Sequence, residues 1–219
     1  MIPDAGVIGQ SGLQFFGKMC ASISHDIKNV LAVINENAGL LEDLCAMAEK
    51  GRSMDPSRLK RLAGDIQEQI RRGDRIVTGM NRFAHSADEA STDVDLSELL
   101  DLLAALALRF AAARGVRVQV NRPPAAVRVT TAPFLLLNLM WLCLEGAMAT
   151  AGPGTVELTA ENAADGACLR LCRIEGLKEA PAAFLSAEPK GALCLALKAQ
   201  LSLDPEKNEM ALRLPKNRV

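Results

Sequence analysis

The chain is poor in aromatic residues: its 219 residues include one tryptophan, six phenylalanines and no tyrosine. Single-stranded nucleic acids bind by stacking their bases on aromatic side chains, and this composition offers few such platforms. The formal net charge of −1 also lacks the excess of cations on which affinity for nucleic acid rests. We therefore expect no nucleic-acid partner, and a core built from Leu, Ala, Val, Ile and Met.

Metal ligands and targeting segments are scarce as well. The six cysteines form no C-x-x-C pair and there are only two histidines, so we expect no metal site and interpret the thiols as buried and reduced. The first residues lack the basic and apolar regions of a secretory signal. The most apolar stretch, residues 132–150, contains Asn138, Glu145 and Gly146, which favours a buried helix over a membrane span. We expect a cytoplasmic protein with no membrane partner.

Apolar residues before position 90 recur at alternating spacings of three and four, which is typical of long helices with one apolar seam. A segment rich in turn residues at 49–56 separates two such seams, so we predict an antiparallel hairpin. One hairpin cannot shield both seams from water. We expect a homodimer with a four-helix bundle, and packing against the second half of the chain is the alternative. The seams are Phe16, Cys20, Ile23, Ile27, Val30, Ile34, Ala38, Leu41 and Cys45, then Leu59, Leu62, Ile66, Ile70, Val77, Met80 and Phe83.

Helical and strand patterns alternate after a polar linker at 85–93, in which His85 is interpreted as a solvated residue. Asp95 and Glu98 form a capping box at the start of a helix that ends near Gly115. Further helices are predicted at 133–150 and 192–200, and strands at 116–120, 127–129, 155–160, 167–173 and 210–214. The fold class is therefore α+β, with a helical hairpin domain at 1–90 and an α/β sandwich domain at 91–219.

The residues best suited to chemistry lie on the first helix. His25 is two residues from each of the seam residues Ile23 and Ile27, so it points roughly 160–200° away from them, toward solvent. Asp26 can hold the imidazole tautomer and favour the positive charge that develops when a ring nitrogen attacks phosphorus. Asn29, one turn further on, can orient a phosphoryl oxygen or a water molecule. These three residues form the candidate catalytic site.

The segment His25-Asp26-Ile27-Lys28-Asn29 resembles the H-box of sensor histidine kinases of the HisKA type. The resemblance implies that His25 is the phosphoacceptor, Asp26 the activating acid and Asn29 a residue that supports dephosphorylation of a response regulator. Val30 stands where the family usually has proline. Weaker likenesses to the dimerisation and ATP-binding domains of that family occur at residues 76–83, 95–100, 134–140, 191–197 and 210–215.

The nucleotide motifs of the family are missing. Leu142 stands where the resemblance expects an asparagine that holds Mg²⁺. After the strand at 167–173, the resemblance expects an Asp-x-Gly-x-Gly motif whose aspartate binds adenine, and this chain has Ile174-Glu-Gly176 instead. A glycine-rich lid is absent too, although phosphates need backbone N–H groups and the metal needs oxygen ligands. This combination resembles the dimeric histidine phosphotransferases built on a degenerate kinase scaffold, including the ChpT type and the sporulation phosphorelay type. It implies no cofactor.

The expected function is that of a histidine phosphotransferase in a two-component phosphorelay, which shuttles phosphate through His25 to or from a response-regulator aspartate without binding ATP. The expected partners are a response-regulator receiver domain, a second copy of the chain and, as a further candidate, a hybrid histidine kinase. Three alternatives remain: a divergent ATP-dependent sensor histidine kinase, a non-catalytic dimeric interaction module and a regulator phosphatase. Basic residues along the second helix suit an acidic receiver pocket, and they suit a merely solvated face equally well.

Overall fold

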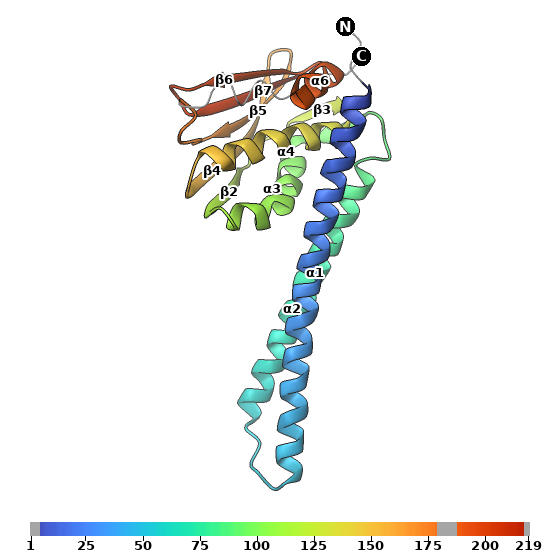
Figure 1. The fold of residues 1–219 in the computed structure, drawn as a ribbon, viewed down its shortest axis with the longest axis vertical. Coiled ribbons are helices and arrows are strands. Elements are labelled where there is room, and N and C mark those ends of the chain that lie inside the picture. The colour runs from blue at the N-terminus through green and yellow to red at the C-terminus, as the bar shows by residue number, and fades with distance from the viewer. Residues whose placement is uncertain (1–4, 179–187, 217–219) are drawn as a thin grey trace. The chain divides into compact units, whose positions relative to one another are not determined.

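The computed structural model describes residues 5–178 and 188–216, which divide into two compact units (Figure 1). The hairpin unit comprises Met19–Asn81, and the α/β unit comprises Met1–Lys18 together with Arg82–Val219. The α/β unit therefore includes the start of the first helix and the end of the second. The functional division predicted at residue 90 stays a prediction.

The hairpin unit is formed by α1 (Ala5–Glu49) and α2 (Pro56–His85), which run antiparallel and side by side over residues 19–81 (Figure 1). Asp55 caps the start of α2, because its carboxylate accepts hydrogen bonds from the backbone N–H and the hydroxyl of Ser57 at 2.9 and 2.8 Å. Gly73 lies where the helices approach closely: a Cβ added there would be 3.4 Å from Cγ1 of Val30. The predicted antiparallel hairpin is confirmed.

The residues buried between the two helices differ in part from the predicted heptad positions. On α1, Ile23 and Val30 are buried as predicted, but Leu44 takes the buried position expected for Cys45, which is exposed. On α2, Ile70 and Val77 were predicted to lie in the seam and are instead 56% and 39% exposed. A straight helix has 3.6 residues per turn, so a strict 3.5-residue pattern rotates away from the partner helix over its length.

The α/β unit contains two sheets. The five-stranded sheet has the order β2-β4-β5-β7-β6, in which β2 and β4 are parallel and the other neighbours are antiparallel. The second sheet pairs β1 with β3, antiparallel. The strands are β1 (Thr92–Asp95), β2 (Val116–Asn121), β3 (Arg128–Thr131), β4 (Gly154–Ala163), β5 (Gly166–Cys172), β6 (Gln200–Asp204) and β7 (Glu209–Pro215).

Helices α3 (Leu96–Ala112) and α4 (Pro133–Thr150) cover one face of the five-stranded sheet (Figure 1), and α6 (Glu188–Leu197) packs on α4. Buried residues alternate along the strands and point toward these helices, as at Val156 and Leu158. The opposite face of the sheet carries charged side chains such as Glu157 and Arg170. The predicted α+β class, a helical hairpin with an α/β sandwich, is confirmed. The four-helix bundle on dimerisation stays a prediction.

Several boundaries differ from those predicted. Two short strands were missed: β1 lies where a linker was expected, and β6 follows α6 directly. A strand of four or five residues is too short to show a clear period, and pairing with β3 and β7 decides its conformation. The first helix begins at Ala5 rather than near Phe16. The predicted loop at Pro181 lies outside the described residues.

The apolar helix α4 is the central helix of the α/β unit. It is long and apolar enough to cross a membrane by length and composition alone, with a mean hydropathy of 1.4, and 56% of it is buried inside the structure. Among its side chains, Leu136, Leu139, Met140 and Leu144 have no solvent exposure. These burials confirm the prediction of a core helix.

Aromatic side chains gather at one place in the α/β unit. Phe15 lies 5.3 Å from Phe83, 5.7 Å from Phe134 and 6.2 Å from Trp141, measured between ring centroids. The Nζ of Lys18 lies 5.2 Å from the Trp141 ring centroid, and Lys18 also pairs with Glu145 on α4. This aromatic cluster fixes the start of α1 and the end of α2 to α4, with roughly 0.5–1.5 kcal/mol per ring pair beyond the burial of area.

We predict that Ser11→Ala destabilises the α/β unit. The Ser11 hydroxyl donates to Oδ1 of Asn138 (3.4 Å) and accepts from its Nδ2 (3.1 Å), and Asn138 is completely buried. The alanine variant leaves this buried amide without its partner, at a cost of about 1–3 kcal/mol. Urea unfolding followed by the fluorescence of Trp141, the one tryptophan, measures the loss. Ser24→Ala, at an exposed position of the same helix, is the matched control; equal midpoints for both variants would contradict the prediction.

Candidate functional site

His25 lies on an exposed part of α1 within the hairpin unit, with its side chain 49% exposed. Its Nδ1 is 3.1 Å from Nδ2 of Asn29, one helical turn further on. The nearest oxygen of Asp26, Oδ1, is 3.9 Å from the same Nδ1. The structure thus brings the three predicted site residues together on one helix surface, and their catalytic roles stay a prediction.

The contact between His25 and Asn29 bears on which ring nitrogen can react. If the amide presents its NH₂ group to Nδ1, that nitrogen accepts and the ring proton must sit on Nε2. If the amide turns by 180° and presents its oxygen, Nδ1–H donates and Nε2 keeps a lone pair. Only the second arrangement makes Nε2 a nucleophile. Among the described residues, no group lies within hydrogen-bond distance of Nε2.

Asp26 acts on the ring through its charge rather than through a hydrogen bond. A separation of 3.9 Å is beyond hydrogen-bond length, yet unit charges at that distance still interact by about 1 kcal/mol in water and more near a protein surface. Because the carboxylate is only 30% exposed, its field is partly protected from solvent. The arrangement favours an imidazole that becomes positively charged during a reaction.

Part of the basic character of α2 is neutralised within the helix. Glu68 accepts hydrogen bonds from Arg71 at 2.9 and 3.1 Å and from Arg75 at 3.3 Å. These arginines hold the pKa of the Glu68 carboxyl below its usual value. The described cations of α2 that make no ion pair are available to an acidic partner surface: Arg58, Lys60, Arg61 and Arg72.

Three residues where the resemblance expects nucleotide-binding motifs are apolar, and the exposed Glu175 lies beside two of them. Leu142 is half-buried on α4, and Ile174 and Leu177, just after β5, have no solvent exposure. None of these apolar side chains can ligate a metal ion or accept a hydrogen bond from adenine. The described residues include no group of three or more metal-ligating side chains.

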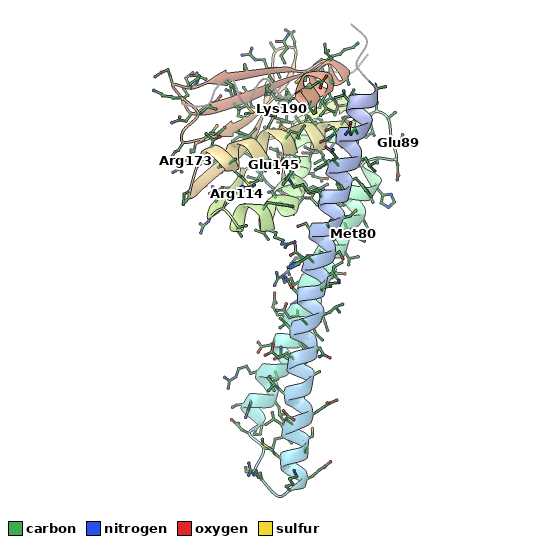
Figure 2. All side chains as sticks on the ribbon, in the orientation of Figure 1. Met80, Glu89, Arg114, Glu145, Arg173 and Lys190 are labelled. Carbon is green, nitrogen blue, oxygen red and sulfur yellow. The ribbon has the colours of Figure 1, made fainter. Side chains whose placement is uncertain are left out.

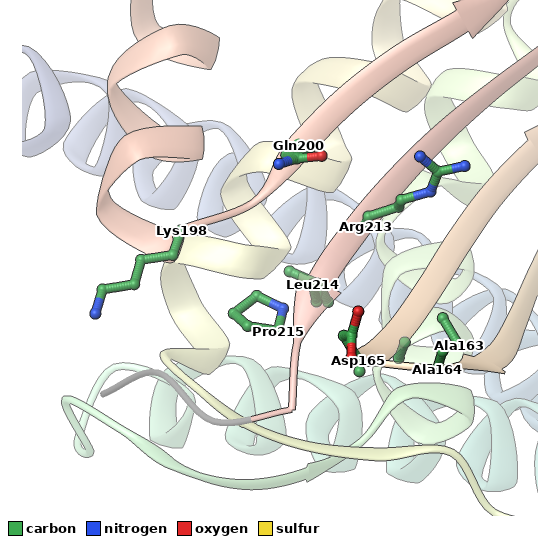
Figure 3. A pocket seen from close by; sticks show the side chains of 10 residues that line it. Ala163, Ala164, Asp165, Lys198, Gln200, Arg213, Leu214 and Pro215 are labelled. Carbon is green, nitrogen blue, oxygen red and sulfur yellow. The ribbon is translucent and has the colours of Figure 1, made fainter.

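A cavity of about 490 Å³ opens at one end of the sheet of the α/β unit, lined by Asp165, Lys198, Gln200 and Arg213 among others (Figure 3). Lys198 and Arg213 extend away from each other in this view, so their charges do not converge on one point (Figure 3). Recognition of a small ligand needs polar groups that converge on it. The cavity therefore gives no second candidate site.

The cysteines differ partly from the prediction. Cys143 and Cys168 are buried, whereas Cys45 is exposed because α1 has rotated away from its predicted seam. Burial raises the pKa of the Cys143 thiol to about 12, so this residue carries almost no thiolate at neutral pH and is not a nucleophile. All six thiols are free.

The hydrogen bond between His85 and Asp88 was not predicted. His85 is the last residue of α2 and is exposed, as predicted, but its Nδ1 is 2.7 Å from Oδ2 of Asp88. The spacing of a histidine and an aspartate three residues apart at a helix end could have indicated the pair.

Comparison with known proteins gives likenesses of fold. No protein-family model matches the chain, and no curated protein matches it. Among solved structures, the catalytic domain of the histidine kinase ThkA is 12% identical, with 59% of this chain and 99% of that chain covered and a TM-score of 0.48. The Acinetobacter baumannii histidine kinase AdeS is 9% identical (88% and 98% covered, TM-score 0.47), and a bacterial phosphotransferase is 13% identical (92% and 96% covered, TM-score 0.46). What the site can do is decided by its own residues.

We predict that Asn29 selects the tautomer of His25. One tautomer of the neutral His25 ring should dominate in the unaltered chain. In Asn29→Ala, the ¹⁵N chemical shifts of the His25 ring should move toward a mixture of the two tautomers. Asn35→Ala, at another exposed position of α1, is the control. Identical tautomer populations in the Asn29→Ala variant and the unaltered chain would refute the selection.

Proposed function

We propose that the chain is a histidine phosphotransferase of a two-component phosphorelay, acting in the cytoplasm. His25 takes a phosphoryl group from one receiver aspartate and passes it to another, without ATP. The observation that supports this most directly is the exposed imidazole of His25 on a long helix, with its Nδ1 beside the Asn29 amide.

The transfer needs little beyond this geometry. The lone pair of Nε2 attacks the phosphorus of an aspartyl phosphate, the bond from phosphorus to the aspartate oxygen breaks, and aspartate leaves as a carboxylate. With the Asn29 amide turned so that its oxygen accepts from Nδ1–H, the ring keeps its Nδ1 proton and becomes positively charged, and the nearby Asp26 stabilises that charge. The reverse reaction delivers the phosphoryl group to a second aspartate. Both steps require an accessible nucleophile on a rigid element, which α1 supplies.

The apolar character of Leu142, Ile174 and Leu177 supports a function without ATP. A kinase must hold three phosphates and a metal ion with oxygen ligands and backbone N–H groups. A divergent kinase is the runner-up function, and labelling by ATP distinguishes it from a phosphotransferase.

We also propose that the hairpin dimerises through an exposed apolar stripe. This stripe is defined as Leu31 on α1 with Ile70 and Val77 on α2, which are 58%, 56% and 39% exposed. Burying such side chains between two hairpins contributes about 25 cal/mol per Å² of apolar area. Leu31 is six residues from His25, which places it about 120° around the helix. A dimer formed on the stripe therefore leaves His25 accessible to a receiver domain.

His25→Gln is predicted to reduce phosphotransfer by at least roughly a hundredfold, because glutamine has no nucleophilic nitrogen. The assay mixes the purified full chain with receiver domains labelled on aspartate and follows acid-labile, base-stable label on the chain. Asn35→Ala is the control on the same helix. Unreduced transfer through His25→Gln would overturn the proposed role of His25.

Ile70→Asp is predicted to shift the chain from dimer to monomer, because it places a charge within the apolar stripe. The molar mass is measured by light scattering over a range of protein concentrations. Thr78→Asp adds the same charge at an exposed position of α2 outside the stripe and should leave the mass unchanged. A dimer of equal affinity in both variants would contradict the assignment of this face.

A further inference from the structure

The second histidine has a more direct carboxylate partner than the first. Nδ1 of His85 is 2.7 Å from Oδ2 of Asp88, a length typical of a charge-assisted hydrogen bond. The side chains of His85 and Asp88 are 77% and 63% exposed. A carboxylate that accepts from Nδ1–H fixes the tautomer with a lone pair on Nε2. Among the described residues, Nε2 of His85 has no hydrogen-bond partner.

The turn that carries this pair is well ordered by hydrogen bonds. The backbone N–H groups of Ser86, Ala87 and Asp88 donate to carbonyl oxygens three residues back, at 3.1–3.2 Å. The Ser86 hydroxyl, which is buried, donates to the carbonyl oxygen of Phe83 at 2.6 Å. Phe83 is itself buried in the aromatic cluster. The His85–Asp88 pair is therefore held on a fixed scaffold, as a reactive pair requires.

One cation lies within reach of the pair. Arg82 is three residues before His85 on α2, so the two side chains are neighbours on the helix surface. Its Nη2 is 3.4 Å from Oε2 of Glu98, a long contact, and the side chain is 47% exposed. A guanidinium at this position can bind the oxygens of a phosphoryl group.

We infer that His85 is a second nucleophile of this chain, which accepts a phosphoryl group from small acyl phosphates or phosphoramidates. Asp88 is its positioning residue. This inference does not depend on His25, because the His85–Asp88 pair lies in the α/β unit and shares no residue with the His25 site.

The reaction with acetyl phosphate balances without another reactant. The Nε2 lone pair of neutral His85 forms a bond to phosphorus, the bond between phosphorus and the acetyl oxygen breaks, and acetate leaves as an anion. The ring keeps its Nδ1 proton and gains a positive charge, which the Asp88 carboxylate stabilises through the existing hydrogen bond. With phosphoramidate, the bond from phosphorus to nitrogen breaks and ammonia leaves.

The test treats the full chain with acetyl phosphate and, separately, with phosphoramidate. The acid-labile phosphoryl group is then located by fragmentation mass spectrometry that preserves it. The chain has only two histidines, so His25→Gln and His85→Gln assign the label. We expect His25→Gln to keep labelling at His85, and His85→Gln to lose it. We expect the rate at which His85 is labelled to fall at least roughly tenfold in Asp88→Asn.

Glu89→Gln is the matched control, because it neutralises the next carboxylate along the chain, which is exposed (Glu89 is labelled in Figure 2). It should label as fast as the unaltered chain. Circular dichroism of each variant verifies that α2 is intact. Equal labelling rates for Asp88→Asn and Glu89→Gln, or no label on His85 in the His25→Gln variant, would overturn the inference. Because the donors are small molecules, failure here leaves the transfer between receivers through His25 unaffected.

Discussion

The structure depends on one aromatic cluster. The chain is poor in aromatic residues, yet all six that the structure describes take part in ring contacts in this cluster: Phe15, Phe16, Phe83, Phe110, Phe134 and Trp141. They come from both helices of the hairpin and from α3 and α4. The cluster therefore makes the two ends of the hairpin part of the core of the α/β unit, and α1 carries on from this anchored start as a single helix to His25.

Helix α4 provides the side chains that anchor the start of α1. The Asn138 amide donates a hydrogen bond to the Ser11 hydroxyl. Trp141 stacks on Phe15, and the Lys18 ammonium lies over the Trp141 ring. Leu142 is half-buried at the position where the resemblance expects a ligand for Mg²⁺. These side chains of α4 hold the start of α1, whereas the leucine side chain at position 142 offers no oxygen ligand to a metal ion. The proposed transfer chemistry needs only that α1 be held and that His25 be exposed.

Much of this could be predicted from the sequence, for physical reasons that differ between elements. The long apolar periods of α1 and α2 predict the hairpin, because many residues repeat one pattern. The same pattern misplaces Ile70, Val77 and Cys45, since the register between two helices depends on packing that a heptad count does not contain.

The short elements and the second histidine were harder to predict. The strands β1 and β6 are decided by pairing with distant partners. The three-residue spacing of His85 and Asp88 allows their contact, but the hydrogen-bonded turn that carries Asp88 lies in a segment predicted as a polar linker. The closeness of His25, Asp26 and Asn29 follows from helical spacing alone, and for this reason the candidate site was foreseen.

In the proposed relay, His25 receives its phosphoryl group from a protein and not from ATP. The most direct measurement incubates the full chain in parallel with radiolabelled ATP and Mg²⁺, and with a receiver domain labelled on its aspartate, and maps the label by residue. We expect rapid labelling of His25 from the receiver and none from ATP. Rapid labelling of His25 by ATP alone would contradict this transfer route.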